Sequence, residues 1–318
     1  MLSEFLLQFK TQFSFFNLFE YLTFKTAISA ITALVISFII GPVIIKILKK
    51  YQIGEEIRHN GPKSHLTKRG TPTMGGVIII FATLLPTLLY SDLSNTMVII
   101  ILFSTLWMGI IGFIDDYLKI IVKAKEGMIA RYKMIGQIIL GVIISYVIIT
   151  SSDFNGFNTK TTVPFFKNFE FDFGIFYPFV VILVITATSN AVNLTDGLDG
   201  LAIGLLAICF SVFTAISYIS GRIDFSDYLN ILYLPNAGEL SIFASAAVGA
   251  CLGFLWFNSS PAEIFMGDTG SLSLGAALGT MSILLKKEFL LFIIGGVFVL
   301  ETLSVIIQVS YFRYTKYR

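Results

Sequence analysis

Five aspartates stand in three short motifs, and each motif adjoins a long apolar run. Residues 113–119 read FIDDYLK, residues 193–201 read NLTDGLDGL, and residues 265–271 read FMGDTGS. A carboxylate beside a membrane-spanning segment is costly, so such residues usually mark a binding site or a pathway. Carboxylate oxygens together with substrate phosphates are the usual environment of Mg²⁺ in proteins. The motifs therefore predict a Mg²⁺-dependent site for a phosphorylated substrate.

The first two motifs contain more carboxylates than helix capping needs. Asp115 and Asp116 are adjacent at the end of an apolar run, where they repel each other unless a cation or a lysine is bound. Asp196 and Asp199 are three residues apart, on one face of a helix. Solvation or a helix cap is the alternative for these residues. A cap would explain one carboxylate of the second motif and would leave Asn193 and Asp199 unexplained.

The third motif and the segment at residues 68–76 (KRGTPTMGG) add groups that suit an anionic ligand. Asp268 stands at an expected helix start, where free N–H groups and the positive end of the dipole favour a phosphate. Asn258 can supply a polar contact at the same rim. Lys68 and Thr73 add a cation and a hydroxyl, although a turn and a helix start would also explain the proline and glycines. The chain has no Walker-type motif, so ATP hydrolysis is not expected.

The composition is that of an integral membrane protein. Hydrophobic residues make up 55% of the 318 residues, charged residues 13%, and the mean hydropathy is +0.83. These values exclude an ordinary soluble domain. The formal net charge of +2 provides no field for nucleic acid. Cys209 and Cys251 both lie inside apolar runs, which predicts buried thiols and no disulfide.

About 20 apolar residues are needed to cross the hydrocarbon core. On this measure the chain is predicted to be an all-α bundle, one domain over residues 1–318, with nine membrane spans. The predicted spans are residues 26–46, 74–91, 96–114, 134–150, 177–192, 200–219, 240–257, 269–285 and 289–312. Residues 168–174 (NFEFDFG) alternate with the period of a strand, which predicts a short hairpin at the outer interface within residues 151–176.

Basic residues predict the orientation of the spans. With the amino terminus outside, the cytoplasmic loops receive fifteen of the 22 Lys and Arg residues. Lys286 and Lys287 fit this arrangement least, because their turn then lies outside. The same arrangement places all three aspartate motifs on the cytoplasmic face.

Four segments, in this order, resemble the signatures of one bacterial family: residues 70–76, the Asp115-Asp116 pair, residues 193–200 and residues 265–271. The family is that of the phospho-N-acetylmuramoyl-pentapeptide transferases, in the polyprenyl-phosphate N-acetylhexosamine-1-phosphate transferase superfamily. The resemblance runs from about residue 53 to the carboxyl terminus. It implies ten spans and a histidine-containing loop before the tenth, and neither this loop nor a tenth span is expected within the 318 residues.

The resemblance also implies a reaction and its participants. Phospho-MurNAc-pentapeptide would pass from UDP-MurNAc-pentapeptide to undecaprenyl phosphate, giving lipid I and UMP at the bacterial cytoplasmic membrane. Homodimerisation is left open. Asp115, Asp116 and Asp268 would be catalytic, with Asp268 as the Mg²⁺ ligand. The residues expected to bind substrate are Lys68, Thr73, Asn193, Asp196, Asp199, Asn258, Phe265 and Gln308, with Phe265 stacking on the uracil.

Two mechanisms and two other functions stay open at this point. Either an Asp attacks first, or the lipid phosphate attacks the donor directly, and direct attack is favoured because the acceptor is already mostly dianionic at neutral pH. A transferase that uses UDP-GlcNAc would share the acidic motifs, but the TPTMGG segment favours the muramoyl donor. A secondary transporter would place its carboxylates near the bilayer midplane, whereas these carboxylates are predicted at span ends.

Overall fold

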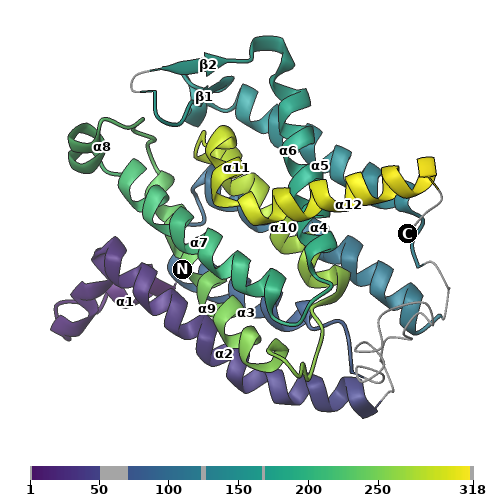
Figure 1. Ribbon diagram of the computed structural model, residues 1–318. Helices are drawn as coiled ribbons and strands as arrows, with labels where there is room; N and C mark the ends of the chain where they lie inside the picture. The colour runs from purple at the N-terminus through teal and green to yellow at the C-terminus, as the bar shows by residue number, and fades with distance from the viewer. Residues whose placement is uncertain (1, 51–70, 123–126, 167–168, 316–318) are drawn as a thin grey trace.

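The computed structural model describes residues 2–50, 71–122, 127–166 and 169–315, and this part of the chain is an all-α bundle with one small hairpin (Figure 1). The elements are α1 (Leu2–Leu7), η1 (Ser14–Glu20), α2 (Leu22–Lys50), α3 (Gly76–Tyr90), α4 (Thr96–Ile120), α5 (Ala130–Thr150), η3 (Ser152–Phe154), β1 (Lys160–Thr162), β2 (Glu170–Asp172), η4 (Gly174–Phe176), α6 (Tyr177–Thr195), α7 (Leu201–Ser220), α8 (Ile223–Leu229), η5 (Ala237–Glu239), α9 (Leu240–Asn258), α10 (Gly267–Leu284), α11 (Glu288–Ile294) and α12 (Gly296–Thr315).

The helices confirm a polytopic membrane protein. In the described part of the chain, seven helices are long and apolar enough to cross a membrane: α2, α4, α5, α6, α7, α9 and α12. The predicted span at 74–91 is the shorter apolar helix α3. The predicted span at 269–285 is α10, which is buried from Thr269 to Leu284. Because α10 faces other helices rather than lipid, small residues replace the large apolar residues of a lipid-facing span.

The ninth predicted span is not one helix. The structure divides residues 289–312 between α11, which ends at Ile294, and α12, which begins at Gly296. Gly295 accounts for the break, because consecutive glycines lack the side-chain packing that keeps a helix continuous. Hydropathy alone could not reveal the break, since both halves are apolar.

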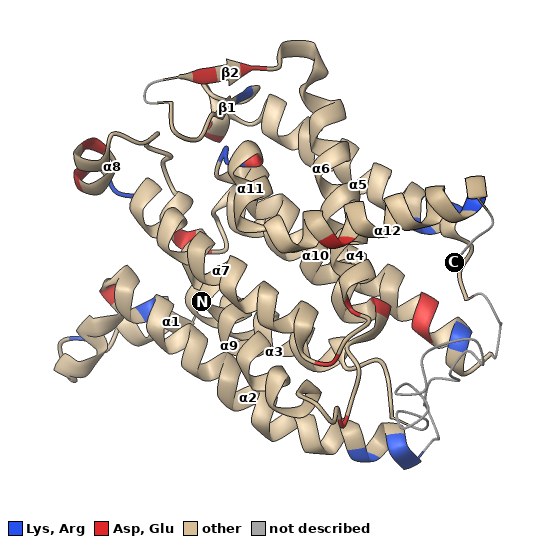
Figure 2. Ribbon diagram, viewed as in Figure 1, with Lys and Arg blue, Asp and Glu red and all other residues tan. Residues whose placement is uncertain are grey.

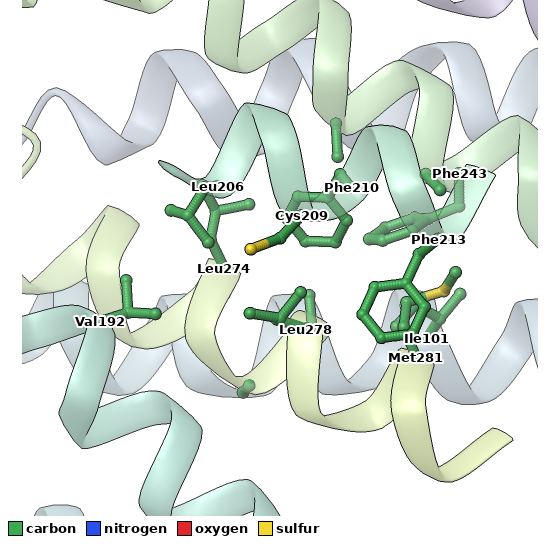
Figure 3. Packing of buried hydrophobic residues seen from close by; sticks show 14 of the residues in the cluster. Ile101, Val192, Leu206, Cys209, Phe210, Phe213, Phe243, Leu274, Leu278 and Met281 are labelled. Carbon is green, nitrogen blue, oxygen red and sulfur yellow. The ribbon is translucent and has the colours of Figure 1, made fainter. Parts of the chain in front are cut away.

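Helix α10 is the central helix for the site. Figure 3 shows Leu274, Leu278 and Met281 packed beside residues of α7, among them Phe213 and Cys209. Cys209 and Cys251 are buried free thiols, which confirms their prediction. On other sides α10 approaches its neighbours through glycine: an added Cβ at Gly76 of α3 would overlap the backbone of Gly270. The start of α10 is therefore held against α3 without intervening side chains.

The predicted hairpin is present and is fastened to the turn between α10 and α11. Strands β1 and β2 pair antiparallel, and Thr162 N donates to the carbonyl of Lys286 at 3.1 Å. Lys286 is fully buried, and its Nζ donates to Tyr177 Oη at 2.8 Å and to the Asn158 carbonyl at 2.9 Å. Burial lowers the pKa of the Lys286 ammonium to about 8. Lys286 therefore belongs to the packed base of the hairpin and not to an exposed loop, which is where the charge rule applies.

Helices α4, α6 and α10 are among those that connect the hairpin end of the bundle with the opposite end. Helix α4 begins beside the hairpin segment, where Thr96 Oγ1 donates to Asp153 at 2.5 Å. Helix α6 begins directly after the hairpin, and α10 ends at the Lys286 turn. At their far ends, α4 carries Asp115 and Asp116, α6 carries Asn193, and α10 carries Asp268. Three distant segments of sequence are thereby brought together.

Candidate active site

Asp116 accepts hydrogen bonds from the start of α10. Its Oδ1 accepts from the backbone N–H of Asp268 at 3.1 Å, and its Oδ2 accepts from the Thr269 N–H at 2.9 Å and the Thr269 hydroxyl at 2.6 Å. The first N–H groups of a helix have no partner within the helix. A carboxylate supplied by α4 satisfies two of them and also complements the helix dipole. Asp116 therefore fixes the position of the backbone that carries Asp268.

Asp115 is oriented differently and faces two lysines. Lys119 Nζ lies 2.5 Å from Asp115 Oδ2 and 3.1 Å from Asp268 Oδ2. Lys133 Nζ, from α5, lies 2.8 Å from Asp115 Oδ2 and also contacts Asp268 Oδ2. The Met128 N–H donates to Asp115 Oδ1 at 2.6 Å. The two ammonium groups bridge carboxylates that would otherwise repel each other (Figure 2 shows the charged positions along the chain).

Neither lysine was predicted as a site residue. Lys119 stood in the FIDDYLK motif, where a bound cation or a lysine was expected to relieve the repulsion of the two aspartates. Lys133 entered only among the basic residues of the predicted cytoplasmic loops. Lys119 follows Asp115 by one helical turn, and this spacing was a usable signal. Lys133 stands on another helix with no motif around it, so no local pattern pointed to it.

The carboxylates can hold a divalent cation. One oxygen each from Asp115, Asp116 and Asp268 lies within 4.8 Å of the others. Asp115 is fully buried, and the side chain of Asp268 is 14% exposed, so a ligand can reach the latter. Two amines already gather around Asp115 Oδ2 and Asp268 Oδ2, which marks the place where positive charge is stabilised. Hard oxygen donors with an open side fit Mg²⁺, and Asp116 is the least available of the three because its oxygens accept from α10.

Asn193 completes the same cluster from α6. Its Nδ2 donates to Asp268 Oδ1 at 2.9 Å and to Ser271 Oγ at 2.8 Å. Thr73 is buried in the segment before α3, and an added Cβ at Gly267 would lie 2.8 Å from Thr73 Oγ1 and 2.7 Å from Asp116 Oδ2. The Gly267 φ of +72° also favours glycine. Thr73 is thus directly beside the start of α10.

Other predicted substrate residues connect the loops at this end of the bundle. Asn258 is buried, its Nδ2 donates to the Ile264 carbonyl at 2.8 Å, and its Oδ1 accepts from the Gly200 N–H at 3.0 Å. Asp199 accepts from the Ala262 N–H at 3.4 Å. Both side chains join the loop after α6 to the loop after α9. This loop-joining role was not foreseen, and a substrate contact by either residue stays a prediction.

The remaining predicted residues are placed less directly. Asp196 directly follows the end of α6, and Phe265 is half-buried just before α10. Gln308 is exposed on α12, and its Nε2 donates to Ser304 Oγ at 3.0 Å. Within the described chain no hydrogen bond joins Gln308 to the carboxylate cluster. Lys68 lies outside the described residues.

Comparison with known proteins agrees with this arrangement of motifs. The family model described as Glycosyl transferase family 4 matches residues 98–286, which include Asp115, Asn193 and Asp268. A phospho-N-acetylmuramoyl-pentapeptide-transferase signature matches residues 68–80. Proteins with the name phospho-N-acetylmuramoyl-pentapeptide-transferase are similar over nearly the whole chain. That of Desulforapulum autotrophicum is 48% identical over 316 residues, covering 99% of this chain and 87% of its own length.

Two further relatives have the same name. The protein of Pelobacter propionicus is 50% identical over 300 residues, 94% of this chain and 83% of its own length. That of Thermodesulfovibrio yellowstonii is 48% identical over 315 residues, 99% of this chain and 87% of its own length. The chain belongs to the phospho-N-acetylmuramoyl-pentapeptide-transferase family. The two matches cover the motifs on which the sequence resemblance was based, namely the segment that leads into α3 and the aspartate motifs of α4, α6 and α10.

Proposed function

We propose that this transferase moves phospho-MurNAc-pentapeptide from UDP-MurNAc-pentapeptide to undecaprenyl phosphate, forming lipid I and UMP. The observation that carries the proposal is the convergence of Asp115, Asp268, Lys119, Lys133 and Asn193 at the start of α10, in a chain of this family. Such a site combines carboxylates for a cation with amines for phosphate oxygens.

Asp268 and Asp115 are the residues that would hold Mg²⁺. When it is bound, the cation neutralises charge on the donor diphosphate and stabilises the leaving phosphate. Lys119 and Lys133, which lie beside these carboxylates, would contact phosphate oxygens of the donor from their present positions. Asp116 keeps the start of α10 in place. The expected donor-binding residues beyond this cluster are Lys68, Thr73, Asn193, Asp196, Asp199, Asn258, Phe265 and Gln308.

Direct attack by the acceptor is the favoured chemistry. An oxygen of undecaprenyl phosphate forms a bond to the β-phosphorus of the donor, and the bond from that phosphorus to the bridging oxygen breaks. UMP leaves with the electron pair. The acceptor phosphate has a second pKa of about 6 in water, so little deprotonation is required at neutral pH. Asp115 then orients the acceptor, or removes its remaining proton where the acidic surroundings raise that pKa.

The site is proposed to face the cytoplasm, with the protein in the bacterial inner membrane. Fifteen of 22 basic residues support this orientation. UDP-sugars are cytoplasmic nucleotides in this scheme, while the acceptor reaches the site from the bilayer. Both substrates can then meet at the membrane surface.

The test is UMP release by the purified chain with undecaprenyl phosphate, Mg²⁺ and either UDP-MurNAc-pentapeptide or UDP-GlcNAc. We expect release with the muramoyl donor that depends on both lipid and metal. Release with UDP-GlcNAc alone would instead support the sibling transferase. Ion or substrate uptake into vesicles without UMP release would support the transporter alternative.

A further inference from the structure

An amide pair joins α5 to α6 one helical turn from the candidate active site. Asn190 Nδ2 of α6 donates to Gln137 Oε1 of α5 at 3.1 Å and to the Thr186 carbonyl at 2.8 Å. Gln137 follows Lys133 by four residues on α5, and Asn190 precedes Asn193 by three on α6. Residues at these spacings share a helix face. The amide pair and the two Asp268 contacts, Lys133 and Asn193, therefore stand one above the other along the same helix–helix seam.

Other contacts of α5 near the pair are close but differ in kind. At Gly141 an added Cβ would overlap the side chain and backbone of Ile182 on α6, so this apolar contact fixes the distance between the two helices. On its other side α5 is tied to α4, because Trp107 Nε1 donates to the Gly136 carbonyl at 3.0 Å. Hydrogen bonds are directional, so they restrain rotation of α5 about its own axis. Two directional bonds from two neighbouring helices thus meet α5 within about a turn of Lys133.

The amide pair is a poor device for stability. Gln137 is fully buried, yet its Nε2 has no hydrogen-bond partner among the described residues, and neither has the buried Thr186 Oγ1. Exchanging the oxygen and nitrogen of the Gln137 amide would set two N–H donors against each other and would not remove the problem. An interhelical hydrogen bond in a membrane contributes little on average. The free-energy cost of a buried donor without a partner is larger than the stabilisation that one such bond contributes.

We propose that Gln137 and Asn190 are positioning residues that hold the Lys133 ammonium between Asp115 and Asp268. The proposal rests on the proposed transferase function. Loss of the pair would let the first turns of α5 rotate, which would move Lys133 relative to the two carboxylates while the apolar packing of α5 remained. The buried Gln137 amide then costs stability through its unpartnered Nε2 and sets the geometry of a charged group through its Oε1.

The test uses Gln137→Met, which has a similar shape without polar atoms, with Ile138→Met as the control at an outward-facing neighbour. For Gln137→Met we expect an unchanged or higher thermal midpoint, turnover lowered by at least about tenfold, and a donor KM within about twofold. The Lys133 amine should be acylated faster, measured by mass spectrometry relative to Lys160 of the hairpin. Ile138→Met should match wild type in thermal midpoint, turnover, donor KM and Lys133 acylation.

A rescue variant separates positioning from a general packing defect. The double change Gln137→Asn with Asn190→Gln preserves an amide pair of the same total reach, so it should recover turnover and slow acylation of Lys133. If Gln137→Met fails to fold, Asn190→Leu on the exposed side of the pair takes its place. Unchanged turnover and unchanged Lys133 acylation in the single variants would overturn the proposal. A lowered thermal midpoint in the single variants, with no recovery of turnover in the double variant, would overturn it as well. Failure of wild type to release UMP would contradict the proposed function, whereas the acylation result reports on positioning independently.

Discussion

The carboxylate of Asp116 accepts the backbone N–H of Asp268, 152 residues later in the chain, at 3.1 Å. The two adjacent aspartates of α4 therefore differ in their surroundings. Asp116 binds the start of α10, and Asp115 binds the two lysines beside Asp268. In the sequence they form one adjacent pair, whereas their contacts assign them two separate roles.

Asparagine substitutions should separate the two roles. Asp116→Asn places an NH₂ group against the N–H donors of α10, so we expect the free energy of unfolding to fall by about 1–2 kcal/mol, as for loss of a helix cap, together with loss of turnover. Asp115→Asn keeps the shape and removes the charge, so turnover should fall on the order of 10²-fold with little change in stability. Thermal unfolding in detergent and UMP release measure both. Equal loss of stability in the two variants would contradict this division.

Asp268→Asn should weaken metal binding while the protein still folds and inserts. The change preserves the side-chain shape and removes a charged oxygen ligand that faces the open side of the cluster. We expect Mn²⁺ affinity, measured by electron paramagnetic resonance, to fall at least about tenfold, and turnover to be abolished. A near-wild-type rate for this variant at low Mg²⁺ would show that the metal is held elsewhere.

Close packing at the start of α10 predicts a large effect of one methyl group. An added Cβ at Gly112 of α4 would overlap the carbonyl of Asp268. We expect Gly112→Ala to lower stability by about 1–3 kcal/mol and to reduce turnover, because the backbone of Asp268 must move. Gly204→Ala on α7 is the matched control, since no atom lies within 4 Å of its added Cβ. That change should be neutral or stabilising, and similar losses in both variants would refute the packing argument.

The proposed orientation predicts which positions react with a membrane-impermeant thiol reagent. A cysteine at exposed Ile129, beside the Lys133 end of α5, should react only from the cytoplasmic side. A cysteine at exposed Asn155, near the hairpin, should react only from outside. Cys209 and Cys251 are buried and provide a low background. Intact spheroplasts expose the outer face and inverted vesicles expose the cytoplasmic face. Labelling of both cysteines in the same preparation, and of neither in the other, would contradict the proposed orientation.

Long apolar runs predicted the class of fold, the alternation of residues 168–174 predicted the hairpin, and the aspartate motifs predicted a carboxylate cluster that includes Asp115, Asp116 and Asp268. These features depend on local composition and spacing, because crossing hydrocarbon requires consecutive apolar residues and costly charges persist only where they have a role. The break at Gly295 escaped this reasoning because hydropathy averages over both halves of the interrupted helix. Family resemblance correctly indicated the transferase family from motif order.

Other features depended on which helices pack together. Lys133 reaches Asp268 only because α5 packs beside α6 and α4, and nothing near Lys133 in sequence distinguishes it from other loop lysines. Asp116 caps α10 because the close approach of α4 and α10 leaves buried N–H groups of α10 that need an acceptor. Asn258 links two loops for the same reason, because the loops meet and leave buried backbone groups of Gly200 and Ile264 that need a partner. Polar side chains take whichever partners the packed fold places within hydrogen-bonding distance, so their roles follow from three-dimensional proximity and not from local sequence.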